Sequence, residues 1–173
     1  DLLSPFDGSL ALGLFEKTYT GTMWNGEYFA PKFSFDIETE MIRDEAHTPR
    51  SVLASAFDGS RLVWILPEDL LRFSWLHIES KWIGHNLAFD FSVLITTNKE
   101  AVFRVLKFDR AFDTLLLARL IALAKTGSPE NSKGRFTLGT LAKEKLGLEL
   151  PKEIECNGVA VRTSYGQFLQ NPE

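Results

Sequence analysis

The chain has 173 residues, of which 45% are hydrophobic, so it can form one globular domain with a sizeable core. Its net charge of −4, with no basic block, argues against broad, nonspecific binding of duplex nucleic acid. The single cysteine, Cys156, excludes an internal disulfide and a cysteine-based zinc site. No apolar run approaches the roughly 20 residues that a membrane span needs, and we expect a cytoplasmic protein without a membrane segment.

Three strands are predicted in the first half of the chain, after an irregular segment over residues 1–30 that mixes glycine, threonine and aromatic residues. The strand-like runs are 33–38, 52–57 and 61–66. Asp58-Gly59 joins the second and third runs as a typical hairpin turn. Pro67 then opens a helix, because proline is tolerated in the first helical turn.

Strands and helices alternate in the second half. The pattern predicts a strand over 82–84, a helix over 87–96, a strand over 102–108, a helix over 114–124, a polar loop over 125–135 and a helical stretch over 136–147. Strands first, followed by alternation with helices, predict a single α/β domain with a mixed sheet flanked by helices.

Two acidic side chains share one face of the first predicted strand. Apolar residues at 33, 35 and 37 alternate with polar ones, so Asp36 and Glu38 leave the strand on the same side, roughly 7 Å apart. Neighbouring carboxylates repel each other unless a cation or a proton lies between them. Oxygen ligands of this kind suit Mg²⁺ or Mn²⁺. The alternative is an antiparallel strand with a solvated acidic face.

A third carboxylate follows the strand predicted over 82–84. Gly84 ends that strand, Asn86 stands where a helix N-cap belongs, and Asp90 falls in the first turns of the next helix. An acid near the positive end of a helix stabilises the helix by itself. However, α/β folds also place their sites where a strand is followed directly by a helix. Asp90 is therefore a candidate to bring a third carboxylate to the same cation.

Three segments, taken in order, resemble the DEDD superfamily of 3′–5′ exonucleases. Phe35 to Thr39 resembles the first motif of that superfamily, and Gly84 to Asp90 resembles the second. Phe112 to Leu120 is similar to the segment that follows in ribonuclease D and in the proofreading domains of family A DNA polymerases. The stretch over 136–147 also fits, whereas residues 1–30 match nothing that we can name.

The resemblance implies a ribonuclease H-like fold and a two-metal mechanism with Mg²⁺ or Mn²⁺. By this resemblance, Asp36 would contact both ions, Glu38 would hold the first and Asp90 would support the second. The implied partner is the 3′ end of a single-stranded nucleic acid, contacted by Thr39 and Asn86, with Phe89 stacked on a terminal base. DNA and RNA are not distinguished, and a polymerase or other domain in a longer chain stays open.

The third motif of the superfamily, which supplies a fourth acid with a nearby tyrosine or histidine, is missing. Tyr165 is the tyrosine nearest the end, and Leu169 stands where the acid would be. We expect a chain cut before the motif, because the stretch Arg162 to Gly166 resembles the one that precedes it. The chain would then carry three of four ligands and be weakly active. The alternative is a nucleic-acid-binding or interaction domain that kept the fold and lost the chemistry.

Other conspicuous residues have simpler interpretations. Asp113 precedes a helix, so we expect it to cap that helix rather than to bind metal. His85 is expected to pack or to form a hydrogen bond in its loop, and no partner is identified for His47 or His77. Phe89 and Phe91 lie on different helix faces, so one of them is expected in the core.

Overall fold

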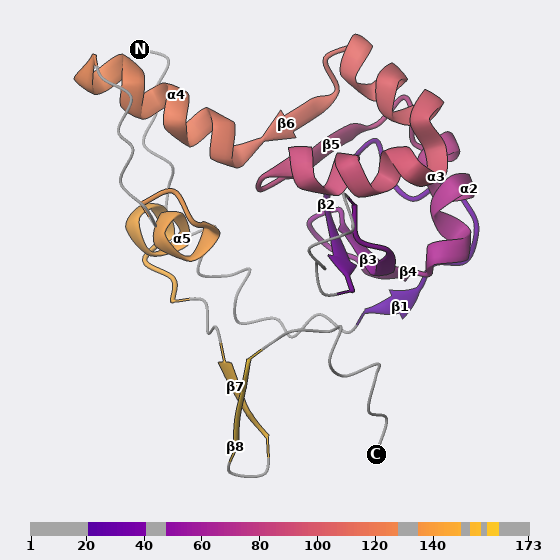
Figure 1. The fold of residues 1–173 in the computed structure, drawn as a ribbon, viewed down its shortest axis with the longest axis horizontal. Coiled ribbons are helices and arrows are strands. Elements are labelled where there is room, and N and C mark those ends of the chain that lie inside the picture. Colours follow the sequence, from indigo (N-terminus) through magenta and orange to yellow (C-terminus); the bar gives the residue numbers. More distant parts are fainter. Residues whose placement is uncertain (1–20, 41–47, 128–134, 150–152, 157–158, 163–173) are drawn as a thin grey trace.

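The computed structural model describes residues 21–40, 48–127, 135–149, 153–156 and 159–162, the last two ranges by their backbone (Figure 1). In chain order the elements are β1 (Thr22–Met23), β2 (Lys32–Thr39), β3 (Ser51–Phe57), β4 (Leu62–Ile65), the 3₁₀ turn η1 (Pro67–Asp69), α2 (Leu70–Leu76), β5 (Lys81–Gly84), α3 (Leu87–Lys107), β6 (Ala111–Asp113), α4 (Thr114–Thr126), α5 (Leu138–Leu146), β7 (Glu153–Cys156) and β8 (Val159–Arg162). Within these ranges, no helix is long and apolar enough to cross a membrane.

A mixed six-stranded sheet forms the centre of the fold, in the order β1-β4-β3-β2-β5-β6. Strands β2, β3 and β4 are antiparallel neighbours, whereas β5 and β6 continue from β2 in parallel. The α/β class and the mixed sheet predicted from the sequence are confirmed. The hairpin turn at 58–59 and the helix opened by Pro67 are confirmed as well.

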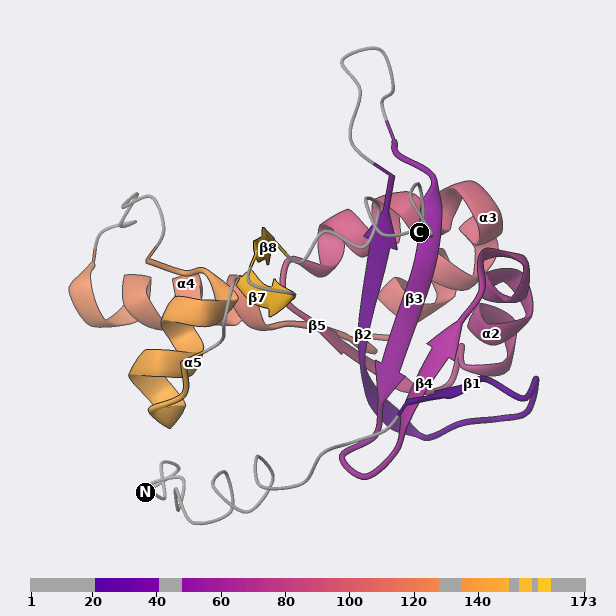
Figure 2. The same ribbon diagram turned by 90° about the horizontal axis from the view of Figure 1, so that it is seen from below.

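The two faces of the sheet differ. Helices α2 and α3 cover one face (Figure 2), where the buried rings of Phe33 and Phe35 lie 4.9 and 4.7 Å from the ring of Trp82. The alternate side chains of β2, at 32, 34, 36 and 38, point to the other face, and all except the half-buried residue at 38 are exposed. We call this the open face, because none of the described helices covers it (Figures 1 and 2).

Helix α4 leads away from the sheet beyond β6, and α5 lies on the same side (Figures 1 and 2). The apolar side chains of α4 are exposed, by 57% at Leu116 and 53% at Leu120. The polar loop predicted from residue 125 begins later than expected, because α4 continues to Thr126 and ends at Gly127 in a left-handed conformation.

The strand predicted over 102–108 is wrong, because α3 continues to Lys107. The run contains valines, which favour strands, but Ala101, Val102 and Val105 recur at helical spacing on the buried side. The helix is interrupted at Asn98, whose φ of −146° and ψ of 77° are not helical. The Asn98 side chain accepts a hydrogen bond from the Ala101 N–H at 3.1 Å, so it caps the second half of α3.

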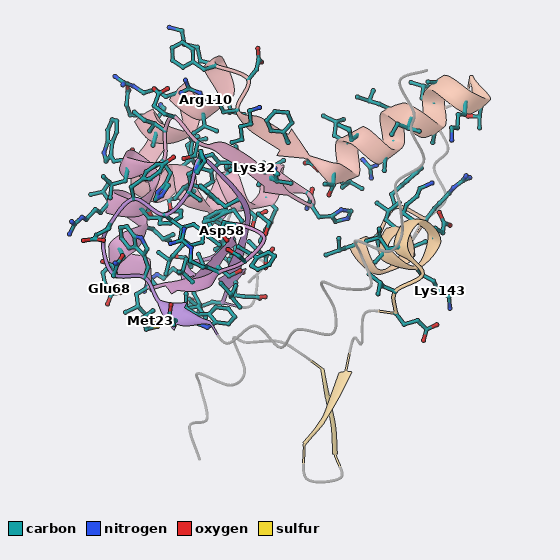
Figure 3. All side chains as sticks on the ribbon, turned by 180° about the vertical axis from the view of Figure 1, so that it is seen from behind. Met23, Lys32, Asp58, Glu68, Arg110 and Lys143 are labelled. Carbon is teal, nitrogen blue, oxygen red and sulfur yellow. The ribbon has the colours of Figure 1, made fainter. Side chains whose placement is uncertain are left out.

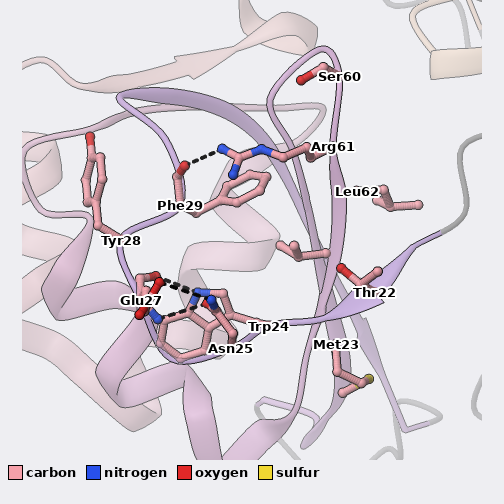
Figure 4. A pocket seen from close by; sticks show the side chains of 11 residues that line it. Thr22, Met23, Trp24, Asn25, Glu27, Tyr28, Phe29, Ser60, Arg61 and Leu62 are labelled. Carbon is pink, nitrogen blue, oxygen red and sulfur yellow. Dashed lines mark hydrogen bonds between the residues drawn. The ribbon is translucent and has the colours of Figure 1, made fainter.

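The segment before β2 is irregular, as predicted for its described part, but it closes one edge of the core. Trp24 and Phe29 are buried, and Trp24 Nε1 donates to the Glu27 carbonyl at 2.8 Å. A hollow of about 470 Å³ lies between residues 22–29 and 60–63, where Arg61 donates to the Phe29 carbonyl at 2.7 Å (Figure 4). It borders β1 and β4, two strands away from the carboxylates on β2.

Candidate active site

Strand β2 places the first two candidate carboxylates on the open face of the sheet. The apolar residues between them are buried against α2 and α3, which fixes the direction of Asp36 and Glu38. Asp36 is exposed and Glu38 is half-buried. On the neighbouring strand β3, Ser55 lies opposite Asp36, and Leu53 lies opposite Glu38. The two acids therefore sit side by side without a basic partner on these two strands.

Asp90 joins them from the helical layer. It lies in the first turn of α3, its side chain is only 3% exposed, and its Oδ1 accepts a hydrogen bond from the Ile37 backbone N–H at 2.8 Å. Strand β5 pairs with β2 only as far as Ser34, so the edge of β2 beyond this point has no strand partner on that side. The Asp90 carboxylate takes this place, next to the residue that separates Asp36 from Glu38.

All three carboxyl groups have raised pKa values. Burial raises the pKa of Asp90 to about 7, against the opposing hydrogen bond from Ile37, and the charge of Asp36 adds to the rise. Burial also raises the pKa of Glu38, with Asp36 contributing again. Although the Asp36 side chain is exposed, partial withdrawal from water raises the pKa of its carboxyl as well. The site thus carries more negative charge than its surroundings stabilise.

The donor chemistry of this site suits a hard divalent cation. Three carboxylates offer oxygen ligands only, and a cation would offset the repulsion that raises their pKa values. Among the described residues, however, no group of three or more histidine, cysteine, aspartate or glutamate side chains is arranged to hold a metal ion. The convergence of Asp36, Glu38 and Asp90 on one ion stays a prediction.

Asp113 caps helix α4, as predicted, and it caps a second helix too. Its carboxylate accepts hydrogen bonds from the backbone N–H groups of Leu115 and Leu116, at 2.8 and 3.3 Å. It also accepts from the N–H groups of Asn86 and Leu87, at 3.1 and 2.9 Å, which begin α3. One carboxylate thus joins the starts of two helices that are 27 residues apart in the chain.

Asn86 occupies the N-cap position of α3, but its side chain makes no capping bond. Its φ of 67° is left-handed, a conformation that asparagine tolerates better than most residues. Its exposed side chain is therefore free of the capping role that the sequence suggested. The adjacent His85 hydrogen-bonds to Thr114 Oγ1 through Nδ1 at 3.0 Å, which confirms its interpretation as a loop histidine.

The remaining candidates lie around these acids. Phe91 is buried in the core, whereas Phe89 is half-buried and packs against the core from its edge. Thr39 is half-buried at the end of β2. Contacts of Thr39, Asn86 and Phe89 with a substrate stay predictions. Tyr165, Leu169 and His47 lie outside the described residues.

His77 is a partner that sequence reasoning missed. Its ring is fully buried, its Nδ1 donates to the Phe73 carbonyl at 2.7 Å, and its Nε2 accepts from the Phe29 N–H at 2.8 Å. The partner at Phe29 is 48 residues away, so no local pattern could have indicated it. His77 is a structural residue of the core, on the side of the sheet opposite to Asp36 and Glu38.

Comparison with solved structures finds this fold in three nucleases or nuclease domains. Escherichia coli RNase D, described as an exoribonuclease involved in structured RNA processing, matches with a TM-score of 0.53 and 19% identity over 86% of this chain and 34% of its own. The Nibbler EXO domain of Aedes aegypti matches with a TM-score of 0.51 and 13% identity over 84% of this chain and 68% of its own. Brucella melitensis NrnC bound to pGG matches with a TM-score of 0.52 and 16% identity over 87% of this chain and 72% of its own.

The chain has the fold of these proteins. This supports the resemblance to the DEDD superfamily that the three motifs carry. No model of a protein family matches the sequence, and no curated protein matches it either. The chain spans about a third of the RNase D chain, so the activity of that whole enzyme does not pass to it directly.

Proposed function

We propose that this chain is a 3′–5′ exonuclease domain that removes nucleotides from the end of a single-stranded nucleic acid with the help of Mg²⁺ or Mn²⁺. The observation that carries the proposal is the hydrogen bond from Ile37 N–H to Asp90. It holds a buried carboxylate beside the two that β2 presents on the open face. The shared fold with an exoribonuclease and with a protein bound to pGG supports the same function.

The carboxylates are the residues that would hold metal. Asp36 would contact both ions, Glu38 would help to hold one, and Asp90 would support the other. Bound there, the ions would activate water and stabilise the charge that builds up on the phosphate. The chain's own backbone keeps Asp90 in place through Ile37, and Asp113 keeps the start of α3 fixed beneath it. Thr39 and Asn86 would orient the 3′ end, and Phe89 would support its terminal base.

The test is a digestion of a 5′-labelled single strand by the full-length gene product. We expect shortening from the 3′ end with Mg²⁺ or Mn²⁺ and none with a chelator. Asp36→Ala should remove nearly all of the activity, because the residue is assigned to both ions. Glu68→Gln removes one exposed carboxylate far from the site and serves as the control. Asp36→Ala with more than about a tenth of the wild-type rate would contradict the two-metal role.

A further inference from the structure

The open face of the sheet carries, besides the two carboxylates, a pair of lysines. Lys32 on β2 and Lys81 on β5 are direct neighbours in the parallel register of these strands. Neighbouring strands lie roughly 4.8 Å apart, and like charges opposite each other destabilise a sheet. Both side chains are exposed, and neither forms an ion pair within the described part of the chain. The pair is therefore a concentrated positive charge that lacks an anion.

An exposed aromatic ring lies next to this pair. Phe112 on β6 is paired with Ile83 on β5, so it points to the same side of the sheet as Lys81. The ammonium group of Lys81 lies 5.8 Å from the centre of the Phe112 ring, and the ring is 39% exposed. Three adjacent strands thus present two cations and a ring on one surface, which we call the lysine-pair surface (Figure 3, where Lys32 lies on the side of the sheet from which α4 departs).

The lysine-pair surface and the carboxylates share one face and one strand. Lys32 and Asp36 are four residues apart on β2 and point the same way, which separates their backbones by roughly 13 Å at about 3.3 Å per residue. Exposed Ser34 lies between them. The open face is thus negative where β2 ends and positive where β2 and β5 begin.

We propose that Lys32, Lys81 and Phe112 form a subsite for the phosphodiester backbone and a base of a single-stranded nucleic acid, upstream of the end that lies at Asp36 and Glu38. A single strand is a polyanion whose bases stack on aromatic rings, and the lysine-pair surface offers both complements. The charge order along β2 gives the strand a direction. Its 3′ end lies at the carboxylates, and its 5′ part runs toward β5 and β6.

The inference rests on the proposed function for this direction, but the binding itself does not. A chain that fails to cut would still bind a labelled strand through the lysines, and binding can be measured without metal. The separation between the two parts of the face also predicts a dependence on length. A dinucleotide held at the carboxylates cannot reach Lys32 and Lys81, whereas a longer strand can.

The experiment measures binding of 5′-fluorescein-labelled oligo(U) and oligo(dT) dodecanucleotides by anisotropy, in the presence of a chelator and over a range of salt. The double variant Lys32→Ala/Lys81→Ala should weaken binding about tenfold at low salt. It should also lower the slope of log affinity against log salt by about 0.7 for each phosphate that is no longer neutralised by a lysine. Lys32→Arg/Lys81→Arg should restore both values. Phe112→Ala should weaken binding without changing the salt slope, and Phe112→Trp should not weaken it.

The matched control is Lys99→Ala/Lys107→Ala, which removes the same charge from exposed positions on α3, in the helical layer. This control should bind like the wild type. In the full-length protein, Lys32→Ala/Lys81→Ala should slow cleavage of the dodecanucleotide and leave cleavage of a dinucleotide unchanged. An unchanged affinity and salt slope in Lys32→Ala/Lys81→Ala, or an equal loss in the α3 control, would overturn the subsite. Lysine-dependent binding without any cleavage would instead overturn the proposed function and keep the subsite.

Discussion

At the scale of single residues, Asp90 is where stability and the proposed function oppose each other. Its pKa is raised from the ordinary value of 3.8 to about 7, so the folded chain binds a proton there that the unfolded chain releases. The stability that this proton contributes is fully present below about pH 4 and is lost as the pH rises through about 7. Without metal, the buried charge therefore destabilises the protein in mildly alkaline solution.

We expect Asp90→Asn to be more stable than the wild type at pH 8 in a chelator, by on the order of 2 kcal/mol, since each pKa unit is worth about 1.4 kcal/mol. Asparagine removes the charge but can still accept the hydrogen bond from Ile37. The difference should disappear near pH 4. Urea unfolding at both pH values checks this, with Glu68→Gln as the control for loss of an exposed carboxylate. An Asp90→Asn variant that is less stable than the wild type at pH 8 would contradict the assignment.

His77 should produce the opposite dependence on pH. Burial lowers its pKa, so the folded chain disfavours the charged ring, and protonation at Nε2 would break the bond from Phe29. Its contribution to stability is present above about pH 6.5 and is lost as the pH falls below that value. His77→Gln should therefore cost about 1–3 kcal/mol at pH 7.5, and this difference from the wild type should narrow at pH 5. A difference that stays constant between these pH values would contradict a neutral, buried His77.

At the scale of elements, the starts of α3 and α4 depend on one side chain. Asp113 accepts four backbone hydrogen bonds, two from each helix, whereas Thr137 accepts one at the start of α5. Removal of a cap costs about 0.5–2 kcal/mol. Asp113→Ala should accordingly lower the free energy of unfolding by about 2–3 kcal/mol, and Thr137→Ala by about 1 kcal/mol, as measured by urea unfolding.

The same variants separate capping from metal binding. Asp113→Asn keeps an acceptor oxygen and removes the charge, so it should retain part of the stability and the full shift in melting temperature caused by Mg²⁺. If Asp113→Asn instead abolished that shift while Asp36→Asn left it intact, Asp113 would be a metal ligand and the capping interpretation would be incomplete.

At the scale of the whole molecule, the 173-residue chain should bind divalent metal weakly. The resemblance requires a fourth acid, and Leu169 at its expected position cannot ligate an ion. Each missing carboxylate removes a ligand and a charge, which Mg²⁺ binding needs. At about 10 mM Mg²⁺ and a dissociation constant in the millimolar range, we expect a stabilisation of only about 1–2 kcal/mol.

Thermal melts with and without Mg²⁺ measure this effect. The shift should be larger at pH 8 than at pH 6, because protons compete with the ion for carboxylates whose pKa values are raised. Asp36→Asn should abolish it. The isolated chain should also cut a labelled single strand slowly or not at all, and robust cleavage would show that another residue or a partner chain supplies the fourth ligand.

The sequence by itself determined the features that depend on neighbours in the chain. Alternation over 33–38 fixed which side of β2 is buried, because a strand with one apolar face has only one stable orientation, and so it fixed the shared face of Asp36 and Glu38. The hairpin turn at 58–59 and the cap at Asp113 follow from residues with strong local preferences.

The tertiary structure decided what depends on partners far away in the chain. The second half of α3 is helical because its valines pack at helical spacing against the core, although the same residues favour a strand. Asp90 meets Ile37 because β5 stops pairing with β2 after Ser34, and Lys32 meets Lys81 because the two strands are in parallel register. These contacts join residues about fifty positions apart. No local pattern encodes such a pairing, because the energy that selects it comes from burying the whole sheet and its helices at once.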